Sequence, residues 1–555
     1  MTFMNPVIPG FYPDPSICRV GEDYYLVNSS FHYFPGVPIF HSRDLVNWRQ
    51  IGHCLTRATQ LQLSGLHSSM GIFAPTLRYH DGYLYMITTL VSGMSNDGMH
   101  NFYVRASDPS GPWCEPVTLD WPGIDPSLFF DEDGRVYITG TNDFSGEESG
   151  IYQAELDLES GKLLSPRQLI WSGTGGKSPE GPHMYRVNGR YYLMIAEGGT
   201  EYGHMVTIAR SDHPFGPFEG APNNPILSNR STGLPIQATG HADLVQAHDE
   251  SWWAVMLGIR PVSRKHHLGR ETCLAPVSWS EDGWPVIGDN AQLLAEMRGP
   301  DFYQHQLRKQ DHLANQEQLA DQDQLSEQDQ LSKQAHLSDL VQLADQEHLL
   351  EQDLLDHFTA PQLKDYWNFL RNPYPSDWSL DSRPGWLTLN GSAVTLNDVD
   401  SPALVARRQQ HFNCNISTLL EFEPGLNEEA GLTVLMNERH HYELALTTIR
   451  GQRSVILRKR VGSIWMVAAE QEYAGTAIIL EIHADQKSYT FGYRVSQEEP
   501  LVVLGDAECR LLATEVAGGF TGVYFGLYAT GNGQASQQPA YFDWFKYQVG
   551  LSTVN

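Results

Sequence analysis

Five similar segments recur in the first 300 residues. The residue at the equivalent position near the start of each segment is an acid in three of them and a histidine in a fourth. In chain order, these five residues are Asp14, Ala74, Asp125, Glu180 and His241. Three acids that meet in one pocket repel one another, which costs stability unless they serve a purpose. Facing carboxyl groups can act as a protonated acid and an ionised base, the pair that hydrolysis of a glycosidic bond needs. A single acid could simply cap a strand start, but three in register favour catalysis.

The segments that hold these residues repeat one pattern, two strands joined by a hairpin turn. They read PDPSICRVGEDYYLVNSS, APTLRYHDGYLYMITT, DPSLFFDEDGRVYITG, EGPHMYRVNGRYYLMIAE and HADLVQAHDESWWAVMLG. The pattern recurs at intervals of about 50 to 60 residues, and a second strand pair follows each copy, as in propeller blades of four strands. The sequence therefore predicts an all-β chain that begins with a five-bladed β-propeller over residues 1–300. An ordinary β-sandwich with chance similarity is the alternative.

In a propeller, the first strand of each blade lines the central channel, so the five opening residues should converge near the axis. The strings around them also resemble a known family. NPVIPGFYPDPSI, GIDPSLFF and SPEGPHMY resemble the three motifs of glycoside hydrolase family 43, the β-xylosidase and α-L-arabinofuranosidase family, and FPGVPIFHSRDLVNW, GIFAPTLRYH and LGRETCL resemble its flanking motifs. This resemblance implies an inverting hydrolase with Asp14 as general base and Glu180 as general acid. It implies that Asp125 orients Glu180 and modulates its pKa.

The same resemblance implies a set of substrate-binding residues. Phe31 and Phe73 would line the sugar subsite, Arg270 would bond sugar hydroxyls, and His241 would lie at the channel floor. Many relatives have Trp where this chain has Phe73. Each residue also has a plainer interpretation: the phenylalanines could be core, and Arg270 could pair with Glu271 or a surface acid. His241 could be a hydrogen-bonded channel residue or a ligand to a structural Ca²⁺ in the channel.

Residues 301–358 have a different composition and form a separate predicted segment. They contain no Gly or Pro, are rich in Gln and acids, and carry Leu at every sixth position from 307 to 355. Six helical steps advance about 240°, so these leucines visit three faces and cannot form a coiled-coil seam. Hexads such as QEQLAD and QDQLSE indicate a low-complexity insert, either solvated helix or disordered, and self-association is one role that it could have.

From residue 359 to 555 the alternating pattern of strands returns. The predicted strands are GWLTLNG, ALVARRQ, STLLEFE, AGLTVLMN, YELALTTI, SVILRKRV, AIILEIHA, YTFGYRV, GVYFGLYAT and AYFDWFKYQ, which indicates a β-sandwich of two sheets. WNFLRNPYPSDWSL resembles the start of the concanavalin-like sandwich that follows the propeller in family 43 β-xylosidases. The resemblance implies that the sandwich helps to close the pocket and so favours exo-cleavage, with Phe520 and Tyr524 as candidates to reach it. A purely structural second domain is the alternative.

The charge and cysteine content of the chain disfavour several classes of binding partner. The chain has 37 Lys+Arg against 66 Asp+Glu, and a net charge of −29 disfavours nucleic acid and anionic membranes as partners. Six scattered cysteines indicate neither a disulfide framework nor a zinc site. There is no apolar run near 18 residues and no signal-peptide pattern at the N-terminus, so a cytoplasmic location is expected.

These observations predict an exo-glycosidase that releases xylose from the non-reducing ends of β-1,4-xylo-oligosaccharides. It would need no organic cofactor, although a structural Ca²⁺ in the channel stays open, and the resemblance allows a homo-oligomer. An α-L-arabinofuranosidase with the same fold and mechanism is the nearest alternative. A non-catalytic carbohydrate-binding propeller is an alternative of another class. A retaining fructosidase is disfavoured because the chain lacks the Asp-Pro-Asn-Gly string of that group.

Overall fold

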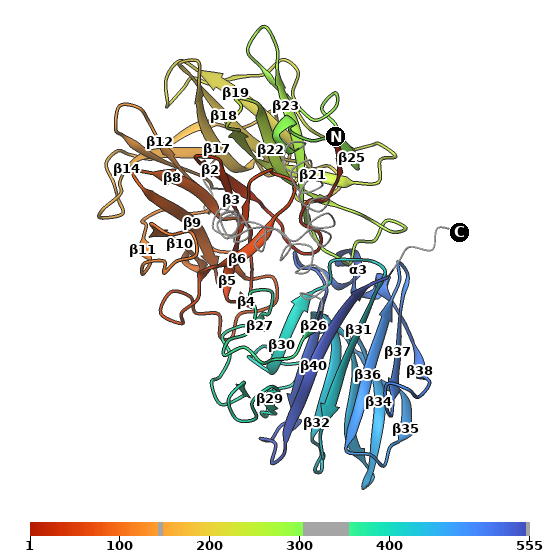
Figure 1. Cartoon of the computed structure of the whole chain (residues 1–555). Helices are drawn as coiled ribbons and strands as arrows, with labels where there is room; N and C mark the ends of the chain where they lie inside the picture. The colour runs from red at the N-terminus through yellow and green to blue at the C-terminus, as the bar shows by residue number, and fades with distance from the viewer. Residues whose placement is uncertain (143–147, 304–354, 551–555) are drawn as a thin grey trace, which may run out of the picture.

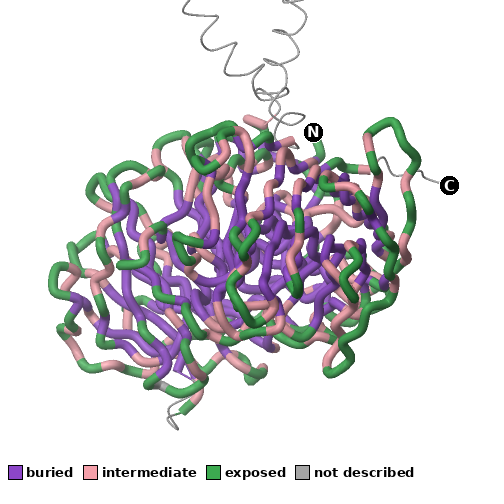
Figure 2. The backbone as a smooth tube through the Cα atoms, turned by 90° about the horizontal axis from the view of Figure 1, so that it is seen from below, coloured by how far each residue is buried: buried purple, intermediate pink, exposed green. Residues whose placement is uncertain are grey.

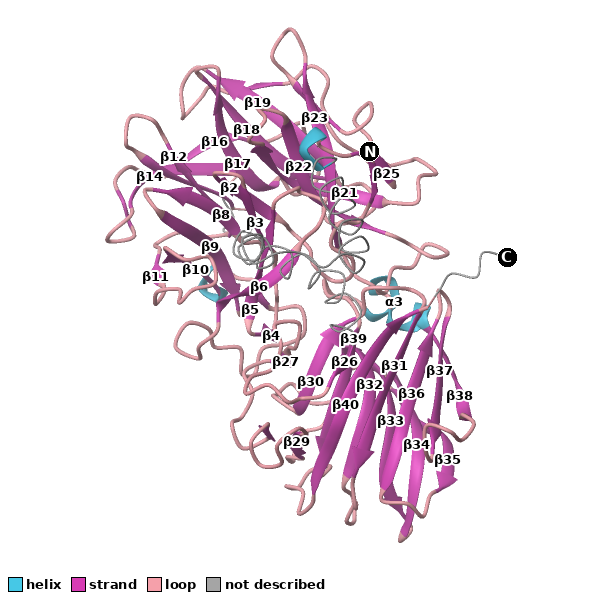
Figure 3. Ribbon diagram, in the orientation of Figure 1, coloured by secondary structure: helices cyan, strands magenta, loops and turns pink. Residues whose placement is uncertain are grey.

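The computed structural model describes residues 1–142, 148–303 and 355–550 (Figure 1). Of the predicted insert, residues 304–354 lie outside the described part. The described chain forms two β-rich bodies, a propeller and a sandwich, with only short helical turns between strands (Figure 3). These turns are η1 (Asn96–Gly98), η2 (Cys509–Leu512) and α3 (Thr514–Ala517). Across the described residues, no helix has the length and apolar character needed to cross a membrane.

Five antiparallel sheets make up the propeller, one for each sequence repeat. The first two sheets contain β2 (Ser16–Val20), β3 (Asp23–Val27), β5 (Gly36–Ser42) and β6 (Arg49–Leu55), then β7 (Gly71–Ile72), β8 (Thr76–His80), β9 (Tyr83–Val91), β10 (Met99–Ala106) and β11 (Val117–Thr118). The third contains β12 (Ile124–Phe130), β13 (Val136–Thr141), β14 (Ile151–Asp157), β15 (Lys162–Leu163) and β16 (Gln168–Trp171). The last two contain β17 (Glu180–Val187), β18 (Arg190–Glu197), β19 (Met205–Ser211) and β20 (Glu219–Gly220), then β21 (Gln237–Gln246), β22 (Trp252–Ile259), β23 (Glu271–Trp279) and β24 (Pro285–Ile287).

The hairpin turns follow from local residue chemistry. Asp81-Gly82 and Asn188-Gly189 join the first two strands of their blades, and all four residues have positive φ between 46° and 80°. Two consecutive residues with positive φ make the turn whose twist matches a β-hairpin, and Asn, Asp and Gly tolerate that conformation best. The predicted hairpins and the predicted five-bladed propeller are therefore confirmed.

The inner strands β2, β8, β12, β17 and β21 contact one another in sequence, and β2 contacts β21, so the ring is closed. The closure is reinforced at the chain ends of the propeller, where β1 (Thr2–Met4) pairs with β25 (Glu296–Arg298). Buried residues fill the interior of the described chain, and exposed residues lie mostly in the turns around its edge (Figure 2). The five opening residues are thus carried on one ring of neighbouring strands.

The second body is the predicted sandwich of two antiparallel sheets. One sheet runs β28 (Trp378–Ser379), β29 (Leu387–Asn390), β40 (Pro539–Val549), β31 (Cys414–Glu421), β36 (Ala477–Ala484), β37 (Ser488–Arg494) and β38 (Val502–Glu508), with β26 (Leu355–Asp356) also paired to β40. The other runs β30 (Ala403–Arg408), β39 (Tyr524–Thr530), β32 (Glu429–Asn437), β33 (His440–Ile449), β34 (Gln452–Val461) and β35 (Ile464–Glu472). All ten predicted strands are present, and the sequence analysis did not predict the short strands β26 and β28 or the longer edge strands β35 and β38.

The sandwich packs directly against the propeller. Strand β27 (Phe369–Leu370) pairs with β4 (Tyr33–Phe34) of the propeller, and Arg408 donates a 2.7 Å hydrogen bond to the carbonyl of Phe11. The Tyr33 and Tyr524 rings stack with centroids 3.9 Å apart. Because this junction combines strand pairing with a shared apolar core, it holds the sandwich in a fixed position beside the central channel.

Candidate active site

The backbone at the start of the inner strands is unusual in the same way in several blades. Asp14, Asp125 and His241 all have positive φ, at 53°, 54° and 48°, and so does Gly181 at 57°, directly after Glu180. Pairing is also irregular early in β12, β17 and β21. A bulge or a left-handed residue redirects the side chain at the end of a strand, and such strain concentrates at functional sites. We call Asp14, Asp125, Glu180 and His241 the carboxylate layer.

Asp14 is buried and strongly bonded. Its carboxylate accepts a 2.7 Å hydrogen bond from Arg270 and a 2.6 Å hydrogen bond from the Ser29 hydroxyl. Nδ1 of His241 lies 4.0 Å away. Burial opposes ionisation, but Arg270, then His241 and then Ser29 outweigh it and hold the pKa of Asp14 below its usual value. Asp14 is therefore ionised near neutral pH, as a general base must be.

Asp125 lies in the same buried region with the opposite electrostatic outcome. Burial, to which the nearby Asp14 charge adds, raises the pKa of Asp125 to about 6, against the stabilising effect of His241. Its Oδ2 accepts a 3.0 Å hydrogen bond from the backbone N–H of Gly181. Since Gly181 follows Glu180, this bond fixes the backbone that carries the predicted acid.

Glu180 is the most accessible of the three acids, with 22% of its side chain exposed. Nε2 of His204 lies 3.8 Å from Glu180 Oε1. Burial lowers the pKa of His204 to about 3, so its imidazole is neutral. Nδ1 of His204 lies 3.4 Å from the Ala238 carbonyl, which can only accept, so this nitrogen carries the proton and Nε2 is an acceptor. The neutral ring therefore places no positive charge beside Glu180.

His241 packs in the middle of this arrangement. A Cβ atom on Gly181 would lie 2.9 Å from the His241 ring, which shows how closely the ring approaches the backbone beside Glu180. The position next to the acid therefore requires glycine for space as well as for its positive φ. The structure brings the three acids and His241 together, as the propeller register predicts.

An aromatic wall stands beside the carboxylate layer. Phe31 lies 5.1 Å from Phe73 and 6.1 Å from Phe520, measured between ring centroids, and Phe520 comes from the sandwich. The Arg270 guanidinium lies 5.6 Å above the Phe31 ring and also faces the carbonyl of Phe520 at 3.4 Å. Of the two sandwich residues singled out in the sequence, Phe520 reaches the site, whereas Tyr524 is fully buried in the domain junction.

Further along the same inner strands lies a second ring, which we call the Asp243 layer. Asp243 accepts hydrogen bonds from both terminal nitrogens of Arg78, at 2.7 and 3.1 Å. The members of this layer, one or two from each blade, are Ser16, Arg78, Ser127, His183, Tyr185 and Asp243. Despite its burial, the Arg78 charge holds the pKa of Asp243 far below its usual value.

The sequence allows a structural Ca²⁺ in the channel, and the Asp243 layer shows how one acidic group of the channel is neutralised. The positive charge beside Asp243 is the Arg78 guanidinium, bonded on both of its terminal nitrogens. Within the described part of the chain, no group of three or more His, Cys, Asp or Glu is arranged to hold a metal ion. The charge of Asp243 is thus compensated by a protein cation, and a Ca²⁺ held by His241 in the channel stays a prediction.

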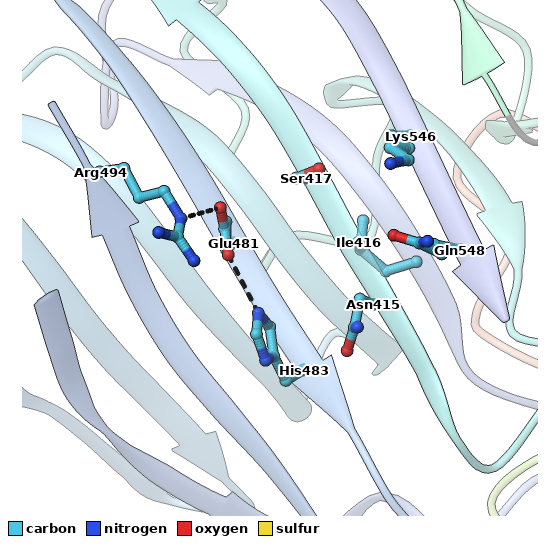
Figure 4. Close-up of a pocket in the computed structure, with 8 residues that line it drawn as sticks. All are labelled: Asn415, Ile416, Ser417, Glu481, His483, Arg494, Lys546 and Gln548. Carbon is cyan, nitrogen blue, oxygen red and sulfur yellow. Dashed lines mark hydrogen bonds and ion pairs between the residues drawn. The ribbon is translucent and has the colours of Figure 1, made fainter. Parts of the chain in front are cut away.

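A cavity of about 250 Å³ lies elsewhere, on the outer face of one sandwich sheet (Figure 4). Its lining comes from β31, β36, β37 and β40 and consists of Asn415, Ile416, Ser417, Glu481, His483, Arg494, Lys546 and Gln548. Glu481 is already paired with Arg494 at 2.6 Å and His483 at 3.0 Å. With no residue from the propeller, this cavity is separate from the carboxylate layer.

Three site residues were not found from the sequence. Ser29 bonds Asp14, His204 faces Glu180, and the Thr200 hydroxyl lies 3.3 Å from Arg270. Thr200 lies in a loop and His204 directly precedes β19, both outside the repeated hairpins, whereas Ser29 lies at the end of the first repeat, just after β3, at a position that the sequence argument did not use. Arg270 bonds Asp14 in this structure, and its expected bond to substrate stays a prediction, whereas Glu271 pairs with Arg260 and not with Arg270.

Comparison with known proteins agrees with this geometry. Residues 3–285 match the family model for glycosyl hydrolases family 43, and residues 355–548 match the beta xylosidase C-terminal concanavalin A-like domain. A non-reducing end alpha-L-arabinofuranosidase of Bacteroides ovatus is 42% identical over 99% of this chain and 95% of its own. A xylosidase/arabinosidase of Butyrivibrio fibrisolvens is 38% identical over 98% of both chains. The crystal structure of a xylan beta-1,4-xylosidase from Bacillus halodurans is 34% identical, with a TM-score of 0.86 over 98% of this chain and 100% of that one.

Proposed function

The chain belongs to glycosyl hydrolase family 43, and on this premise we propose that it removes single xylose units from the non-reducing ends of β-1,4-xylo-oligosaccharides. The observation that carries the proposal is the aromatic wall beside the carboxylate layer, which Phe520 of the sandwich helps to build. A wall supplied by a second domain closes one side of the channel mouth. A channel mouth closed on one side would favour entry of a chain end over the middle of a polymer.

Asp14 is the proposed general base of a single displacement. Its carboxylate would accept a proton from water as the water oxygen attacks the anomeric carbon. Arg270 and Ser29 support this role because their hydrogen bonds keep Asp14 ionised. An inverting reaction needs room for this water between the two acids, which predicts a carboxyl separation of roughly 6.5–9.5 Å.

Glu180 is the proposed general acid. It would donate its proton to the glycosidic oxygen as the bond to the anomeric carbon breaks, so that the leaving sugar departs as an alcohol. The neutral His204 ring, 3.8 Å from Glu180, adds no positive charge that would hold the acid in its ionised form. Asp125 would hold the acid in place through its bond to Gly181.

A second candidate substrate is a terminal α-L-arabinofuranoside. The relative from Bacteroides ovatus is an arabinofuranosidase at 42% identity over nearly the whole chain, and the Butyrivibrio relative is named for both activities. β-Xylosides and α-L-arabinofuranosides present similar atoms to one pocket. Both sugars therefore fit the same mechanism.

The proposal is tested with xylotetraose and with the nitrophenyl glycosides of β-xylose and α-L-arabinofuranose. We expect xylose and xylotriose as the first products of xylotetraose, and a larger kcat/KM for the xyloside than for the arabinofuranoside. Xylobiose as the first product would contradict exo-cleavage. A larger kcat/KM for the arabinofuranoside would replace the first candidate by the second. Turnover of neither glycoside, together with sugar binding that survives Glu180→Gln, would favour the carbohydrate-binding alternative.

A further inference from the structure

The sandwich has an apolar edge on the side away from the propeller. Strand β35 ends one sheet and β38 ends the other, and the two strands contact each other there (Figure 3). Large apolar side chains are exposed along both strands: Ile464 61%, Trp465 50%, Met466 52%, Val467 41%, Val502 39% and Val503 55%. We call these six residues the edge patch. Contiguous apolar surface of this kind marks an interaction site in a folded protein.

The backbone of β35 is also open. In the described part of the chain, β35 pairs with β34 on one side, and no strand pairs with its other side. Natural proteins usually protect such an edge with charged residues or proline, because an unpaired edge recruits other strands. Here Ile464–Ala469 contains no charged residue and no proline.

The register between β34 and β35 defines the charges along this edge. Arg460 lies opposite Trp465, Arg458 lies opposite Val467, and the pairing then shifts by one residue at Ala468. Beyond the shift, Ile456 lies opposite Glu470 and Ser454 opposite Glu472. One face of the sheet therefore differs at the two ends of β35. At its N-terminal end, Trp465 and Val467 lie beside two arginines of β34, and at its C-terminal end β35 carries Glu470 and Glu472.

The charges at the two ends differ in how far they are already neutralised. Arg458 is bonded to Glu429 at 2.6 Å and to Glu443 at 2.5 Å, so its charge is compensated. Among the described residues Arg460 has no ion pair, and its Nε lacks a hydrogen-bond partner. Glu470 and Glu472 are exposed. The edge thus presents an unpaired cation near Trp465 and two solvated anions at the opposite end.

We propose that β35 pairs antiparallel with β35 of a second copy of this chain, around a two-fold axis between Ala468 and Ala469. Only an antiparallel pair related by a two-fold axis places the acidic end of one strand against the basic end of the other. Matching the faces of the two strands sets Trp465 opposite Glu472 of the second copy and Val467 opposite Glu470 of the second copy. Each glutamate then lies two strands, about 9–10 Å, from an arginine of β34, within reach of two long side chains.

This pairing satisfies both features of the edge at once. The free backbone groups of β35 form a ladder, and the two six-stranded sheets become one continuous sheet. Ile464–Val467 of each copy come to lie beside β35 of the other copy, which removes part of their apolar surface from water. The edge lies away from the channel (Figure 1), so the dimer leaves the carboxylate layer open.

The first test is sedimentation of the full-length 62.3 kDa chain at micromolar concentration. We expect a dimer for the native sequence and a monomer for Trp465→Glu. The dissociation constant of the dimer should rise at least 30-fold, an effect of the size found at interface hot spots. Leu164→Glu is the matched control, because Leu164 is 62% exposed on the propeller, and it should leave the dimer intact. A native chain that sediments as a monomer, or a dimer that Trp465→Glu leaves unchanged, overturns the proposal.

The second test addresses the register. Arg460→Glu alone places three acids together, and the double variant Glu470→Arg/Glu472→Arg alone places only arginines together, so each should be mostly monomeric. When the two variants are mixed, both charge clusters of a mixed dimer become complementary, and dimer should return. Failure of the mixture to dimerise overturns the antiparallel register. Unchanged kcat for each variant shows that the chains are folded.

Discussion

The two rings of polar residues on the inner strands differ in how completely their groups are bonded. In the Asp243 layer, both carboxylate oxygens accept short hydrogen bonds from Arg78, Ser16 or Tyr185. In the carboxylate layer, Asp14 is paired with Arg270. The pKa of Asp125 is raised, however, and the side chain of Glu180 is partly exposed. The same five strands thus carry one ring that is neutralised by the protein and another whose acids are left to react.

The strand geometry accounts for this difference. The carboxylate layer sits where φ is positive or the pairing shifts, and the Asp243 layer begins where regular pairing resumes. Irregular backbone re-aims side chains toward the channel, while regular pairing stacks them against neighbouring blades. We therefore expect substitutions in the first ring to reduce catalysis and substitutions in the second to reduce stability.

The largest expected effect comes from removing the two proposed catalytic groups. Asp14→Asn and Glu180→Gln should each lower kcat on xylobiose by about 10²–10⁴-fold with little change in melting temperature. A nitrophenol leaves without protonation, so Glu180→Gln should recover much of its rate on a nitrophenyl glycoside, whereas Asp14→Asn should not. Equal losses on both substrates for Glu180→Gln would contradict its role as the acid.

Asp243→Ala should act on stability instead. It leaves Arg78 buried without its counter-charge, which costs about 3–5 kcal/mol in the free energy of unfolding, measured by denaturant titration. The folded fraction should keep kcat within a few-fold of the native enzyme. A loss of kcat as large as that of Asp14→Asn, in protein of native stability, would erase the distinction between the rings.

The sequence predicted much of this comparison, because both the repeat and the family motifs are local. The hairpins and the family motifs are read from residues a few positions apart, and the recurrence of that pattern predicts the five blades and the convergence of Asp14, Asp125, Glu180 and His241; the structure and the family model show all of these. The contact between Arg270 and Asp14 was not predicted, because it joins residues 256 positions apart and depends on how the blades close into a ring.

The missing strands have a different cause. Strands β35 and β38 read IWMVAAEQE and VVLGDAE, without the alternation that marks a half-buried strand. Alternation arises when one face is buried, and edge strands with both faces exposed lose it. The two long strands that escaped prediction, β35 and β38, are therefore the ones that form the apolar edge.

Replacing Arg270 tests whether its charge keeps Asp14 ionised within the carboxylate layer. Arg270→Met removes the charge that keeps Asp14 ionised, so the pKa of Asp14 should rise. Activity is lost as pH falls through the pKa of the base, and the acid limb of the kcat/KM profile should therefore move to higher pH. An unshifted acid limb, with only KM increased, would indicate that Arg270 acts solely on substrate.

The smallest expected effect is that of His204→Phe. The ring remains, but the acceptor facing Glu180 is lost, so the proton on the acid is held less firmly. The basic limb of the pH profile should move to lower pH, with kcat at its optimum reduced only a few-fold. His204→Gln can keep an acceptor near this position and should restore part of the shift. An unchanged basic limb in both variants would show that His204 has a packing role alone.

The most direct test of the central claim is proton NMR of fresh xylobiose with enzyme, recorded before the released xylose mutarotates. A single displacement by water, with Asp14 as base opposite Glu180, predicts that α-xylose appears first from the β-linked substrate. If β-xylose appears first, the reaction retains configuration through two displacements, and the role of Asp14 as the base that activates water is contradicted.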